Sequence, residues 1–583
     1  MRKVFYETLL LYGIFAVTAL VPLAQQTASP TTAVVAQQLE QGKPIERELK
    51  SKETHAYKLA LAAGQFLNAA VNQRGIDVVV RVFAPDEKLV AQIDSPNGAQ
   101  GDEPIALEAK NAGTYRIEVI PNEESGETAS GRYEIRINEI LSAEAYAKRL
   151  DEHRRAQASV VAWLRQNAFP IKTVEAGSGF DDLQPLKRVL KDVRFVALGE
   201  ATHGTREFFQ FKHRMVEFLV REMGFRVFAI EASFSACQNI NDYVMGKTDD
   251  GAKALDSQGF WTWNTEEVRA MLDWMRAYNQ GVPVGERVKF AGFDIQMNNG
   301  GKAKLLEYLR RVAPERSAAT DAFFQVEEGQ LINVAFGGQA DKAKEARAKL
   351  AELRTQYNSL FIFLELHGAE LAAKTSLSEY EQMREYARVL VQFMDSYSEG
   401  SNALRDLYMA DNVRRLVERE PVTTRVIIWA HNGHIMTDNS DANDLPFGAH
   451  LRRFFGNEYY ALGFSFNQGT FQARESQPKD PANRMLMSFT AHPAPADSID
   501  WYLAQTGVKS FIIDFRSVSK DAHGAEWLAS AHSMRSVGSV YGPSAENSTF
   551  SATNLKRDFD GLFFIETATR ARPNQSVKNV VRE

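Results

Sequence analysis

An acidic and an imidazole side chain stand three residues apart in the run Gly199–Phe208, which reads Gly-Glu-Ala-Thr-His-Gly-Thr-Arg-Glu-Phe. The run follows the apolar stretch Arg194–Leu198 and leads into an amphipathic helical pattern. Glu200 and His203 are therefore predicted to lie in the loop between a strand and a helix. Loops at the carboxyl ends of strands are where α/β proteins collect reactive groups. A carboxylate beside an imidazole at such a place indicates proton-transfer chemistry.

Three further strand candidates end in polar residues that can do chemistry. Glu231 follows one of them, Asp294 ends the second, and the third runs into Ala-His-Asn-Gly-His, which contains His431 and His434. The carboxyl ends of parallel strands lie along one edge of a sheet. We therefore expect these residues to converge with the Glu200 loop, although they are far apart in the chain.

Each of these residues also has a structural interpretation. Glu231 can cap the next helix, and Asp294 can cap a turn. One of the two histidines can serve only to orient the other. Trp261 and Trp263 precede a helix, where two indole rings suit either core packing or the wall of a site for a bulky apolar substrate.

Several common catalytic motifs are missing from the sequence. The run Gly463–Asn467 lacks the final glycine of a Gly-x-Ser-x-Gly elbow, so a serine nucleophile is disfavoured. The sequence also contains no phosphate-binding loop, no dinucleotide fingerprint and no His-Glu-x-x-His. Two kinds of chemistry remain: catalysis without a covalent nucleophile, and metal-assisted catalysis with Glu200, His203, Glu231 and His434 as ligands.

The elements that must position these residues alternate between strand and helix. Apolar runs separated by helical patterns predict an α/β fold with a mostly parallel sheet and flanking helices. The expected strands are Arg194–Leu198, Arg226–Ile230, Val288–Phe293, Arg425–Ala430, Tyr459–Phe466, Ser510–Ile513 and Gly561–Ile565. A long, almost purely helical insertion occupies about residues 302–418, where it is expected to cap the sheet edge and shape the substrate cavity.

The first part of the chain has a different pattern. Residues 31–140 alternate apolar and polar side chains between turn signals, which predicts a small all-β sandwich. Residues 141–167 form a helical connector, and residues 168–583 form the α/β domain. The sandwich resembles the pre-peptidase C-terminal domains of secreted bacterial enzymes at Gln41–Pro44, Tyr57–Leu59 and Gly113–Tyr115. The resemblance implies an accessory module.

The amino terminus predicts export. Residues 1–28 have a basic start, a short apolar core and an exit of small residues, as in a secretory signal peptide; an uncleaved membrane anchor is the alternative. We expect a periplasmic or extracellular protein without a membrane span once the signal is cleaved. Cys237 is the only cysteine, so no intramolecular disulfide can form.

The composition argues against nucleic acid as a partner. The formal net charge of the 583 residues is −6, and no lysine and arginine cluster forms a basic surface. An apolar fraction of 44% is that of an ordinary globular protein, and the length calls for two or more domains. A small molecule is the expected partner, and the oligomeric state is left open.

Together these motifs resemble the erythromycin esterase family from about residue 165 to 573. The matching pieces are Leu198–Gly204 with Glu207 and Phe208, Ile230–Ser233, Gly259–Trp263, Phe290–Asp294, Arg405 and Asp406 with Met409, Ala410 and Asn412, Ala430–His434, and Phe559–Phe563. The resemblance implies hydrolysis of an ester or a macrolide-type lactone without a serine nucleophile and without a cofactor.

The resemblance also implies roles for the candidate residues. His203 would be the general base that takes a proton from water, and Glu200 would orient His203 or share in polarising the water. Glu231 and one of His431 or His434 would bind the water or donate to the oxyanion. Substrate contacts are expected from Trp261, Trp263, Arg206 and Asp294. A basic residue of the next helix, either Arg206 or Lys212, would help to stabilise the oxyanion.

Two other functions remain open at this stage. One is a divalent-metal-dependent hydrolase or peptidase of the same wider superfamily. The other is a non-catalytic exported protein that binds haem or another ligand.

Overall fold

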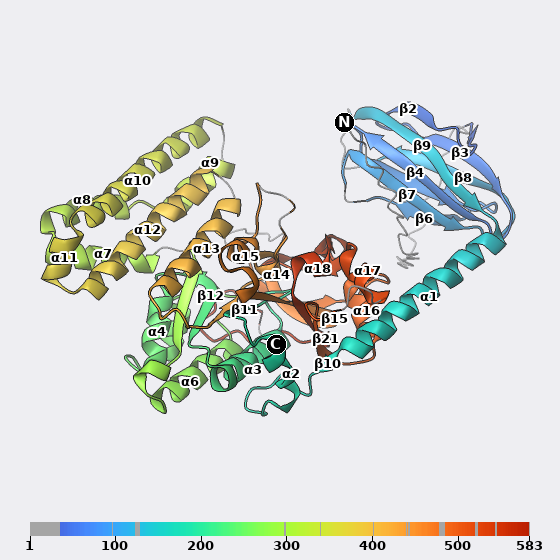
Figure 1. Cartoon of the computed structure of the whole chain (residues 1–583). Helices are drawn as coiled ribbons and strands as arrows, with labels where there is room; N and C mark the ends of the chain where they lie inside the picture. Colours follow the sequence, from blue (N-terminus) through green and yellow to red (C-terminus); the bar gives the residue numbers. More distant parts are fainter. Residues whose placement is uncertain are drawn as a thin grey trace, which may run out of the picture. The chain divides into compact units, whose positions relative to one another are not determined.

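The computed structural model describes residues 35–95, 97–122, 129–296, 299–337, 340–399, 402–438, 440, 443–476, 484–518, 523–542 and 545–581. The chain divides into two compact units, Met1–Ser159 and Val160–Glu583 (Figure 1). The expected signal segment, residues 1–28, lies outside the described residues. Within the described ranges, no helix combines the length and the apolar character needed to span a membrane.

The amino-terminal unit is a sandwich of two β-sheets (Figure 1). One sheet has the strand order β1-β3-β8-β5-β6 and the other β2-β9-β4-β7. Val78, Val80 and Val82 of β5 are fully buried, while Arg81 between them is half-buried, as expected for a strand with one face in the core. The strands are β1 Gln37–Gln38, β2 Ile45–Lys50, β3 His55–Leu61, β4 Phe66–Arg74, β5 Val78–Phe83, β6 Leu89–Ile93, β7 Gln100–Glu108, β8 Gly113–Pro121 and β9 Ser130–Leu141.

Helix α1 (Ala143–Asn167) follows the last strand of the sandwich. The boundary between the two units falls inside this helix, after Ser159. Its carboxyl-terminal residues Trp163 and Leu164 belong to a hydrophobic core of the second unit.

The second unit is built on a ten-stranded sheet with the main order β10-β17-β21-β15-β11-β14-β12-β13. The strands from β21 to β13 run parallel, whereas β17 is antiparallel to β21 and β16 is antiparallel to β15. The predicted α/β fold with a mostly parallel sheet is thereby confirmed. The strands are β10 Phe169–Pro170, β11 Phe195–Leu198, β12 Val227–Ser233, β13 Lys289–Asp294, β14 Val426–Trp429, β15 Tyr459–Glu475, β16 Leu486–Ala491, β17 Ser510–Asp514, β19 Val540–Tyr541 and β21 Gly561–Ala568.

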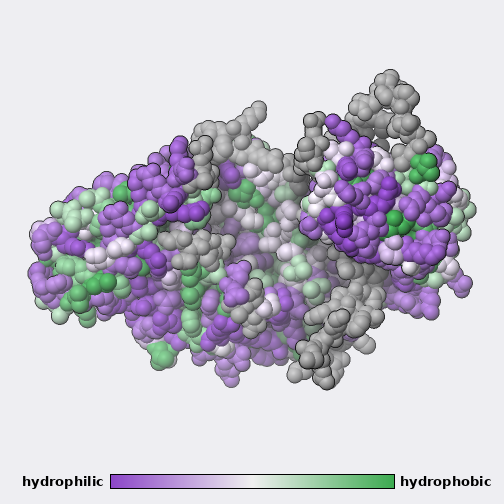
Figure 2. Space-filling view, turned by 90° about the horizontal axis from the view of Figure 1, so that it is seen from above, coloured by the Kyte–Doolittle hydropathy of each residue, from purple (hydrophilic) through white to green (hydrophobic). Residues whose placement is uncertain are grey.

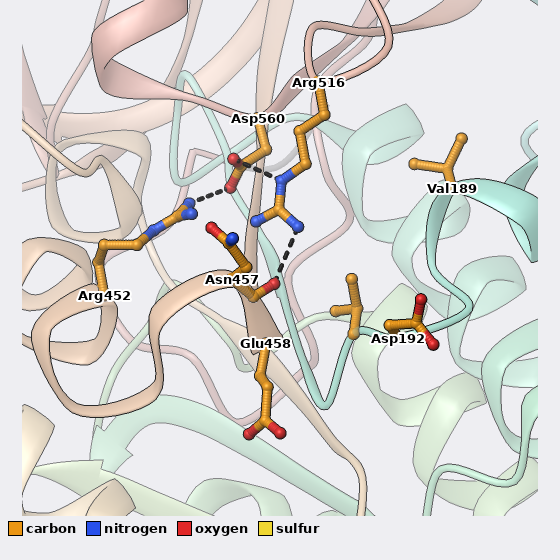
Figure 3. Close-up of a pocket in the computed structure, with 8 residues that line it drawn as sticks. Val189, Asp192, Arg452, Asn457, Glu458, Arg516 and Asp560 are labelled. Atoms are coloured by element: carbon orange, nitrogen blue, oxygen red, sulfur yellow. Dashed lines mark hydrogen bonds and ion pairs between the residues drawn. The ribbon is translucent and has the colours of Figure 1, made fainter.

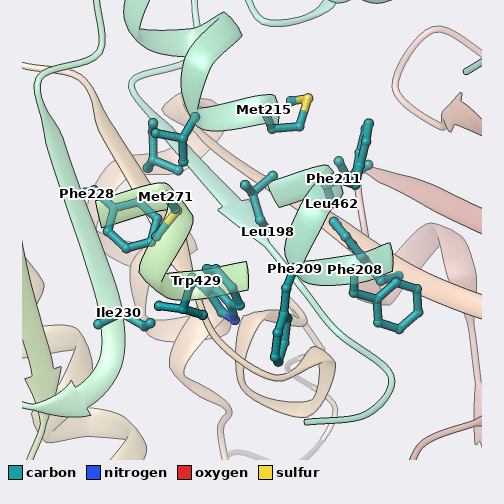
Figure 4. Packing of buried hydrophobic residues seen from close by; sticks show 14 of the residues in the cluster. Leu198, Phe208, Phe209, Phe211, Met215, Phe228, Ile230, Met271, Trp429 and Leu462 are labelled. Carbon is teal, nitrogen blue, oxygen red and sulfur yellow. The ribbon is translucent and has the colours of Figure 1, made fainter. Parts of the chain in front are cut away.

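Helices cover both faces of this sheet, which explains why its strands are apolar on both sides. Val196 and Leu198 of β11 pack in one core, while Phe195 and Ala197 pack in the other. Figure 4 shows the first core, where side chains of α3 lie against the strands. The helices of this face are α2 Pro185–Val189, α3 Arg206–Met223, α4 Cys237–Val244, α5 Gly251–Asp256 and α6 Glu266–Gln280.

The second core contains residues of the later helices and of a small sheet. The helices are α13 Asn402–Glu418, α14 Asn432–Ile435, α15 Phe447–Phe455, α16 Ile499–Gln505, α17 His523–Ala529 and α18 Leu555–Asp558. Strands β18 (His532–Arg535) and β20 (Phe550–Thr553) pair antiparallel beside them.

The helical insertion lies between β13 and β14 and has a hydrophobic core of its own. Its helices before α13 are α7 Asn299–Val312, α8 Pro314–Phe324, α9 Glu328–Gly337, α10 Ala340–Leu366, α11 Gly368–Lys374 and α12 Leu377–Glu399. Asp395 of α12 joins three helices, because it binds Arg354 of α10 at 2.5 Å and accepts the Tyr408 hydroxyl of α13 at 2.9 Å. The face seen in Figure 2 is mainly hydrophilic, with small hydrophobic areas between.

Candidate active site

Five of the predicted polar residues lie at the carboxyl ends of three neighbouring strands. β14 lies between β11 and β12, and Trp429 at its end is opposite Leu198 on one side and Ile230 on the other. Glu200 and His203 follow β11, Glu231 lies in β12 beyond Ile230, and His431 and His434 follow β14. The imidazole rings of His203 and His431 are 4.9 Å apart, and His434 lies 3.2 Å from the Glu231 carboxylate. The structure therefore brings these five side chains together.

Glu200 is fully buried and is bonded to three side chains. Its Oε1 lies 2.7 Å from Nδ1 of His203. Its Oε2 accepts from Nζ of Lys212 at 2.6 Å and from Nε1 of Trp429 at 2.8 Å. Burial opposes the charge of Glu200, but Lys212 and His203 hold the pKa of this carboxyl below its ordinary value. The ionised Glu200 therefore fixes Nδ1 of His203 as a donor.

The other ring nitrogen of His203, Nε2, makes no hydrogen bond within the described residues. The His203 side chain is 13% exposed, so solvent reaches the ring. Trp263 meets the His203 ring edge to face at 5.6 Å between centroids. A histidine with one nitrogen bound to a buried carboxylate and the other unoccupied has the form of a general base.

Lys212 is the basic residue of helix α3 that enters the site. It is fully buried, and its Nζ lies 4.0 Å from the centroid of the Trp429 ring. Burial lowers the pKa of Lys212 to about 8, although Glu200 opposes the shift. Arg206 of the same helix lies elsewhere, because its Nε is 3.5 Å from Glu267 of α6.

Glu231 is the centre of a second buried charge cluster. Its Oε1 accepts from Nη2 of Arg405 at 2.8 Å, and its Oε2 accepts the backbone N–H of His431 at 2.9 Å. Burial opposes its charge, but His434 and Arg405 hold the pKa of the Glu231 carboxyl well below its ordinary value. Glu231 therefore lies in the site as a carboxylate and does not cap the next helix.

Asp294 is bonded both to its own turn and to Arg405. Its Oδ1 accepts the backbone N–H of Ile295 at 2.7 Å. The guanidinium of Arg405 binds both of its oxygens, at 3.0 and 2.9 Å. Asp294 thus closes a turn, as its structural interpretation predicted, and also holds Arg405 against Glu231.

His434 lies between two carboxylates. Its Nδ1 is 2.7 Å from Oδ1 of Asp406, and its Nε2 is 3.2 Å from Oε1 of Glu231. Nη1 of Arg405 is also 2.9 Å from Nε2. Burial disfavours the imidazolium, but Glu231 and Asp406 outweigh it and raise the pKa of His434 to about 10. The carboxylates thus favour the imidazolium, whereas Nη1 of Arg405, which can only donate, has Nε2 as its acceptor in the arrangement that the structure shows.

The pKa of His431 is shifted in the opposite direction to that of His434. Its Nδ1 accepts the backbone N–H of Gly433 at 3.2 Å, and its Nε2–H donates to the carbonyl of Val537 at 3.2 Å. Burial, reinforced by His203, lowers the pKa of His431 to about 3. A neutral ring with both nitrogens occupied is a wall of the site, placed beside the base.

The two tryptophans expected at the site differ in position. Trp263 is buried against His203 and Trp429, and its Nε1 donates to the carbonyl of Glu231 at 3.1 Å. It links the loops after β11 and β12. Trp261 is half-buried.

Three residues of the site had no role assigned from the sequence: Arg405, Asp406 and Trp429. The first two lie on helix α13, in the middle of a helical stretch where charged residues are expected on any solvated face. Trp429 reads as part of an apolar strand. The sequence feature that could have indicated the first two is the adjacent charged pair Arg405–Asp406, on the helix that precedes β14.

The four side chains considered as metal ligands are Glu200, His203, Glu231 and His434. Glu200 is bonded to Lys212, and Glu231 to Arg405, so a divalent cation would have to displace two buried positive charges. In the part of the chain that the structure describes, no three His, Cys, Asp or Glu side chains form a group placed to hold a metal ion. The residues present do not fit a bound divalent cation.

A pocket of about 710 Å³ lies at the opposite edge of the sheet. Its lining residues Val193, Glu458 and Asp560 precede β11, β15 and β21, so the pocket is at the amino ends of these strands. Figure 3 shows Asp560 between the guanidinium groups of Arg452 and Arg516. These arginines are occupied by Asp560 and, for Arg516, by backbone carbonyls. The pocket is separate from the site around His203.

Comparisons of the sequence and of the structure with known proteins match the larger part of the chain to the same family. The model of the erythromycin esterase family matches residues 220–568. The erythromycin esterase type II of Escherichia coli is 25% identical over 431 residues, which are 70% of this chain and 97% of that protein. The solved structure of a mutant of the erythromycin esterase EreC, in its open conformation, has a TM-score of 0.51 at 17% identity and covers 68% of this chain and 96% of its own.

The pre-peptidase C-terminal domain of collagenase from Bacillus anthracis is similar to 19% of this chain and is covered completely, at 16% identity and a TM-score of 0.16.

Proposed function

Since the chain belongs to the erythromycin esterase family of hydrolases, we propose that it hydrolyses carboxylic esters, macrolide-type lactones among them, with His203 as the general base. The observation that carries the proposal is the Glu200–His203 pair, with Nδ1 bound at 2.7 Å and Nε2 unoccupied by the described residues. The substrate is a small molecule with an ester carbonyl beside that nitrogen.

The charged residues around His203 allow it to act as a base. Glu200 keeps Nδ1 of His203 protonated, so the lone pair of Nε2 faces the site. Nε2 takes a proton from a water molecule, whose oxygen attacks the ester carbonyl. Glu200 stabilises the positive charge that His203 acquires, and Lys212 prevents Glu200 from taking the proton itself. General-base assistance of this kind contributes about 10²–10⁴-fold to the rate.

The attack leaves a negative charge on the carbonyl oxygen, and the second cluster supplies cationic donors for it. The guanidinium of Arg405 is the central cation of this cluster, and its Nη1 donates to Nε2 of His434 at 2.9 Å. Held in this way, it is a preorganised positive charge for the developing oxyanion. Glu231 and Asp294 hold Arg405 in place for this task.

The walls of the site suit an apolar acyl or alkyl group. Trp263 and the neutral ring of His431 flank His203, and Phe209 packs on Trp263. Apolar walls with a few convergent polar groups are typical of small-molecule sites.

A substrate screen tests this function. Purified protein is assayed with simple esters and with lactones of increasing ring size, beside His203→Ala and a matched control, His367→Ala, whose histidine is exposed on the helical insertion. We expect His203→Ala to lose turnover by about 10²–10⁴-fold with an unchanged unfolding temperature, and His367→Ala to keep it. Equal turnover in both variants, or no hydrolysis by the natural protein, contradicts the proposal.

We also propose that the protein is exported to the periplasm or the medium, because residues 1–28 have the pattern of a signal peptide. Cell fractionation with mass spectrometry of the mature amino terminus checks this. A full-length protein that stays in the cytosol contradicts it.

A further inference from the structure

After its last strand, β21, the chain runs along two loops of the site. Residues 569–574 pair with the loop that leads into α3 and with the loop that leads into α6. These two loops carry His203 and Trp263. Residues 569–574 are called the strap below.

The first contact of the strap is with the loop of the base. An antiparallel bridge joins Arg570 of the strap to Thr205, which is fully buried. The backbone N–H of Ala571 donates to the carbonyl of Gly204 at 2.9 Å. Gly204 directly follows His203, so the strap holds the backbone one residue away from the base.

The second contact has the same form. An antiparallel bridge joins Pro573 of the strap to Thr265, which is also fully buried. The backbone N–H of Asn574 donates to the carbonyl of Asn264 at 3.0 Å, and its side-chain amide donates to Oδ1 of Asn264 at 2.9 Å. Asn264 directly follows Trp263. Both loops are thus hydrogen-bonded, at equivalent positions, to one short segment.

Glu207, in the first turn of α3, fixes the start of the strap. Its Oε2 accepts the backbone N–H of Thr569 at 2.7 Å, and its Oε1 accepts the Thr569 hydroxyl. The carbonyl of Thr569 accepts the backbone N–H of Arg206 at 2.9 Å. Hydrogen bonds to a carboxylate are stronger than those between neutral groups. Thr569 is therefore held through its N–H, its carbonyl and its hydroxyl.

We propose that the strap positions the base by holding the His203 loop and the Trp263 loop at a fixed spacing, and that Glu207 locks the strap at its first residue. The inference rests on the proposed function of His203. Neither Glu207 nor the strap is assigned a contact with the substrate, so both are positioning elements.

The two supports of His203 have different tasks. Glu200 binds Nδ1 at 2.7 Å and so sets the direction of the ring. The strap fixes the backbone that carries the ring, and thereby the edge-to-face contact with Trp263 at 5.6 Å between centroids. A displacement of about 1 Å of a catalytic group costs on the order of 10²-fold in rate.

The test compares Glu207→Ala with a matched control, Glu315→Ala, in the full chain. Glu207 and Glu315 are both the second residue of a helix, α3 and α8, so both variants lose a carboxylate near a helix amino terminus. Glu315 is exposed and lies in the helical insertion. Hydrogen exchange with mass spectrometry follows residues 199–206, 259–266 and 569–574, and kcat and KM are measured on the ester that the natural protein hydrolyses fastest.

We expect Glu207→Ala to exchange on the order of 10–10²-fold faster in all three segments. The segment before α6 is the informative one, because Glu207 does not touch it and reaches it only through the strap. The kcat of this variant should fall by on the order of 10²-fold with little change in KM. Glu207→Gln keeps an acceptor oxygen and should recover part of the kcat, and Glu315→Ala should match the natural protein.

Should Glu207→Ala fail to fold, Thr569→Val is used, which removes only the hydroxyl bond of an exposed residue and should show smaller changes of the same kind. Faster exchange confined to the neighbourhood of Thr569, or a kcat equal to that of Glu315→Ala, overturns the proposal. The failure of the proposed function has a different signature, since the natural protein then hydrolyses no ester, and the exchange before α6 alone decides whether the strap couples the two loops.

Discussion

The buried ion pair of Glu200 and Lys212 contributes to the stability of the fold and also supports His203 in the proposed reaction. Both side chains are fully buried, and each offsets the charge of the other at 2.6 Å. Removing one partner of a buried ion pair leaves an uncompensated charge, which typically costs about 3–5 kcal/mol.

We therefore expect Lys212→Met to lower the free energy of unfolding by roughly this amount, about 3–5 kcal/mol. The double variant Glu200→Gln with Lys212→Met should lose less than the sum of the two single losses. Chemical denaturation of the four proteins measures the coupling. Additive losses would show that the two charges do not depend on each other.

A second expectation concerns pH. The pKa of His434 in the folded protein, about 10, lies above its ordinary value of 6.5. The contribution of His434 to the free energy of unfolding is therefore complete below about pH 6.5 and is lost as the pH rises towards 10. Lys212 has a lowered pKa of about 8, so its unfavourable contribution is relieved between about pH 8 and its ordinary 10.5.

Denaturation at pH 6, 8 and 10 separates the two groups. Between pH 6 and 8, where Lys212 changes little, the natural protein should lose stability through His434, and His434→Gln should flatten this loss. If the free energy of unfolding of His434→Gln fell with pH as steeply as that of the natural protein, the raised pKa of His434 would be contradicted.

At the scale of residues, the sequence predicted Glu200, Glu231 and the imidazole members of the site, and assigned no role to Arg405, Asp406 and Trp429. Glu200, His203 and Glu231 follow apolar runs, so strand ends point to them directly. Arg405 reaches the site from a helix on the far side of a long insertion, and no periodic pattern tells which face of that helix meets the sheet. Lys212 and Arg206 are both on α3, and only the helix rotation in the structure distinguishes them.

Among the seven strands that the sequence predicted for the second unit, β15 differs most in length from its prediction. The prediction ended it at Phe466, whereas the structure continues it to Glu475. Its second half pairs with β16 and places Phe471 and Ala473 in the first core, so its apolar residues alternate with polar ones and no longer form a continuous run. Gly469, at a φ of 123°, marks the change.

This extension packs against the base-bearing loop. The backbone N–H of Gln472 donates to the carbonyl of Gly204 at 3.1 Å. A Cβ atom at position 204 would lie 2.0 Å from the carbonyl oxygen of Gln472, which is backbone and cannot turn away. The residue next to His203 therefore has to be glycine.

We expect Gly204→Ala to destabilise the protein strongly and to abolish turnover, because relief of the clash displaces His203. Gly433→Ala is the matched control. Its Cβ would meet the nearest atom, Nδ1 of His431, at an ordinary 3.5 Å. Thermal unfolding and turnover of both variants check this. A stable and active Gly204→Ala variant would show that the loop has room to move.

In the whole molecule, the hydrophobic cores divide in the same way as the two compact units. The sandwich core contains residues from Leu39 to Ile137 only, and the cores of the second unit begin at Trp163. All candidate site residues lie in the second unit. The alternation of apolar residues predicted the sandwich strands, whereas the place where one unit ends inside α1 depends on contacts that the sequence pattern does not contain.

We expect the two units to unfold in separate steps. Calorimetry of the full chain should give two transitions, and a chain beginning at residue 142 should lose one of them and keep its kcat/KM on esters. A single transition shared by both chains, or loss of turnover in the shorter one, would show that the sandwich supports the site.

The place of β14 between β11 and β12 has a consequence for biogenesis. The two outer strands leave the ribosome early, yet the strand that joins them follows only after the whole helical insertion has been made. Until then each has an unpaired edge and an apolar surface. Slow, non-local pairing of this kind exposes newly made chains to aggregation. A rapid collapse of the insertion around its own core, or a chaperone that covers the waiting edges, would shorten this exposure.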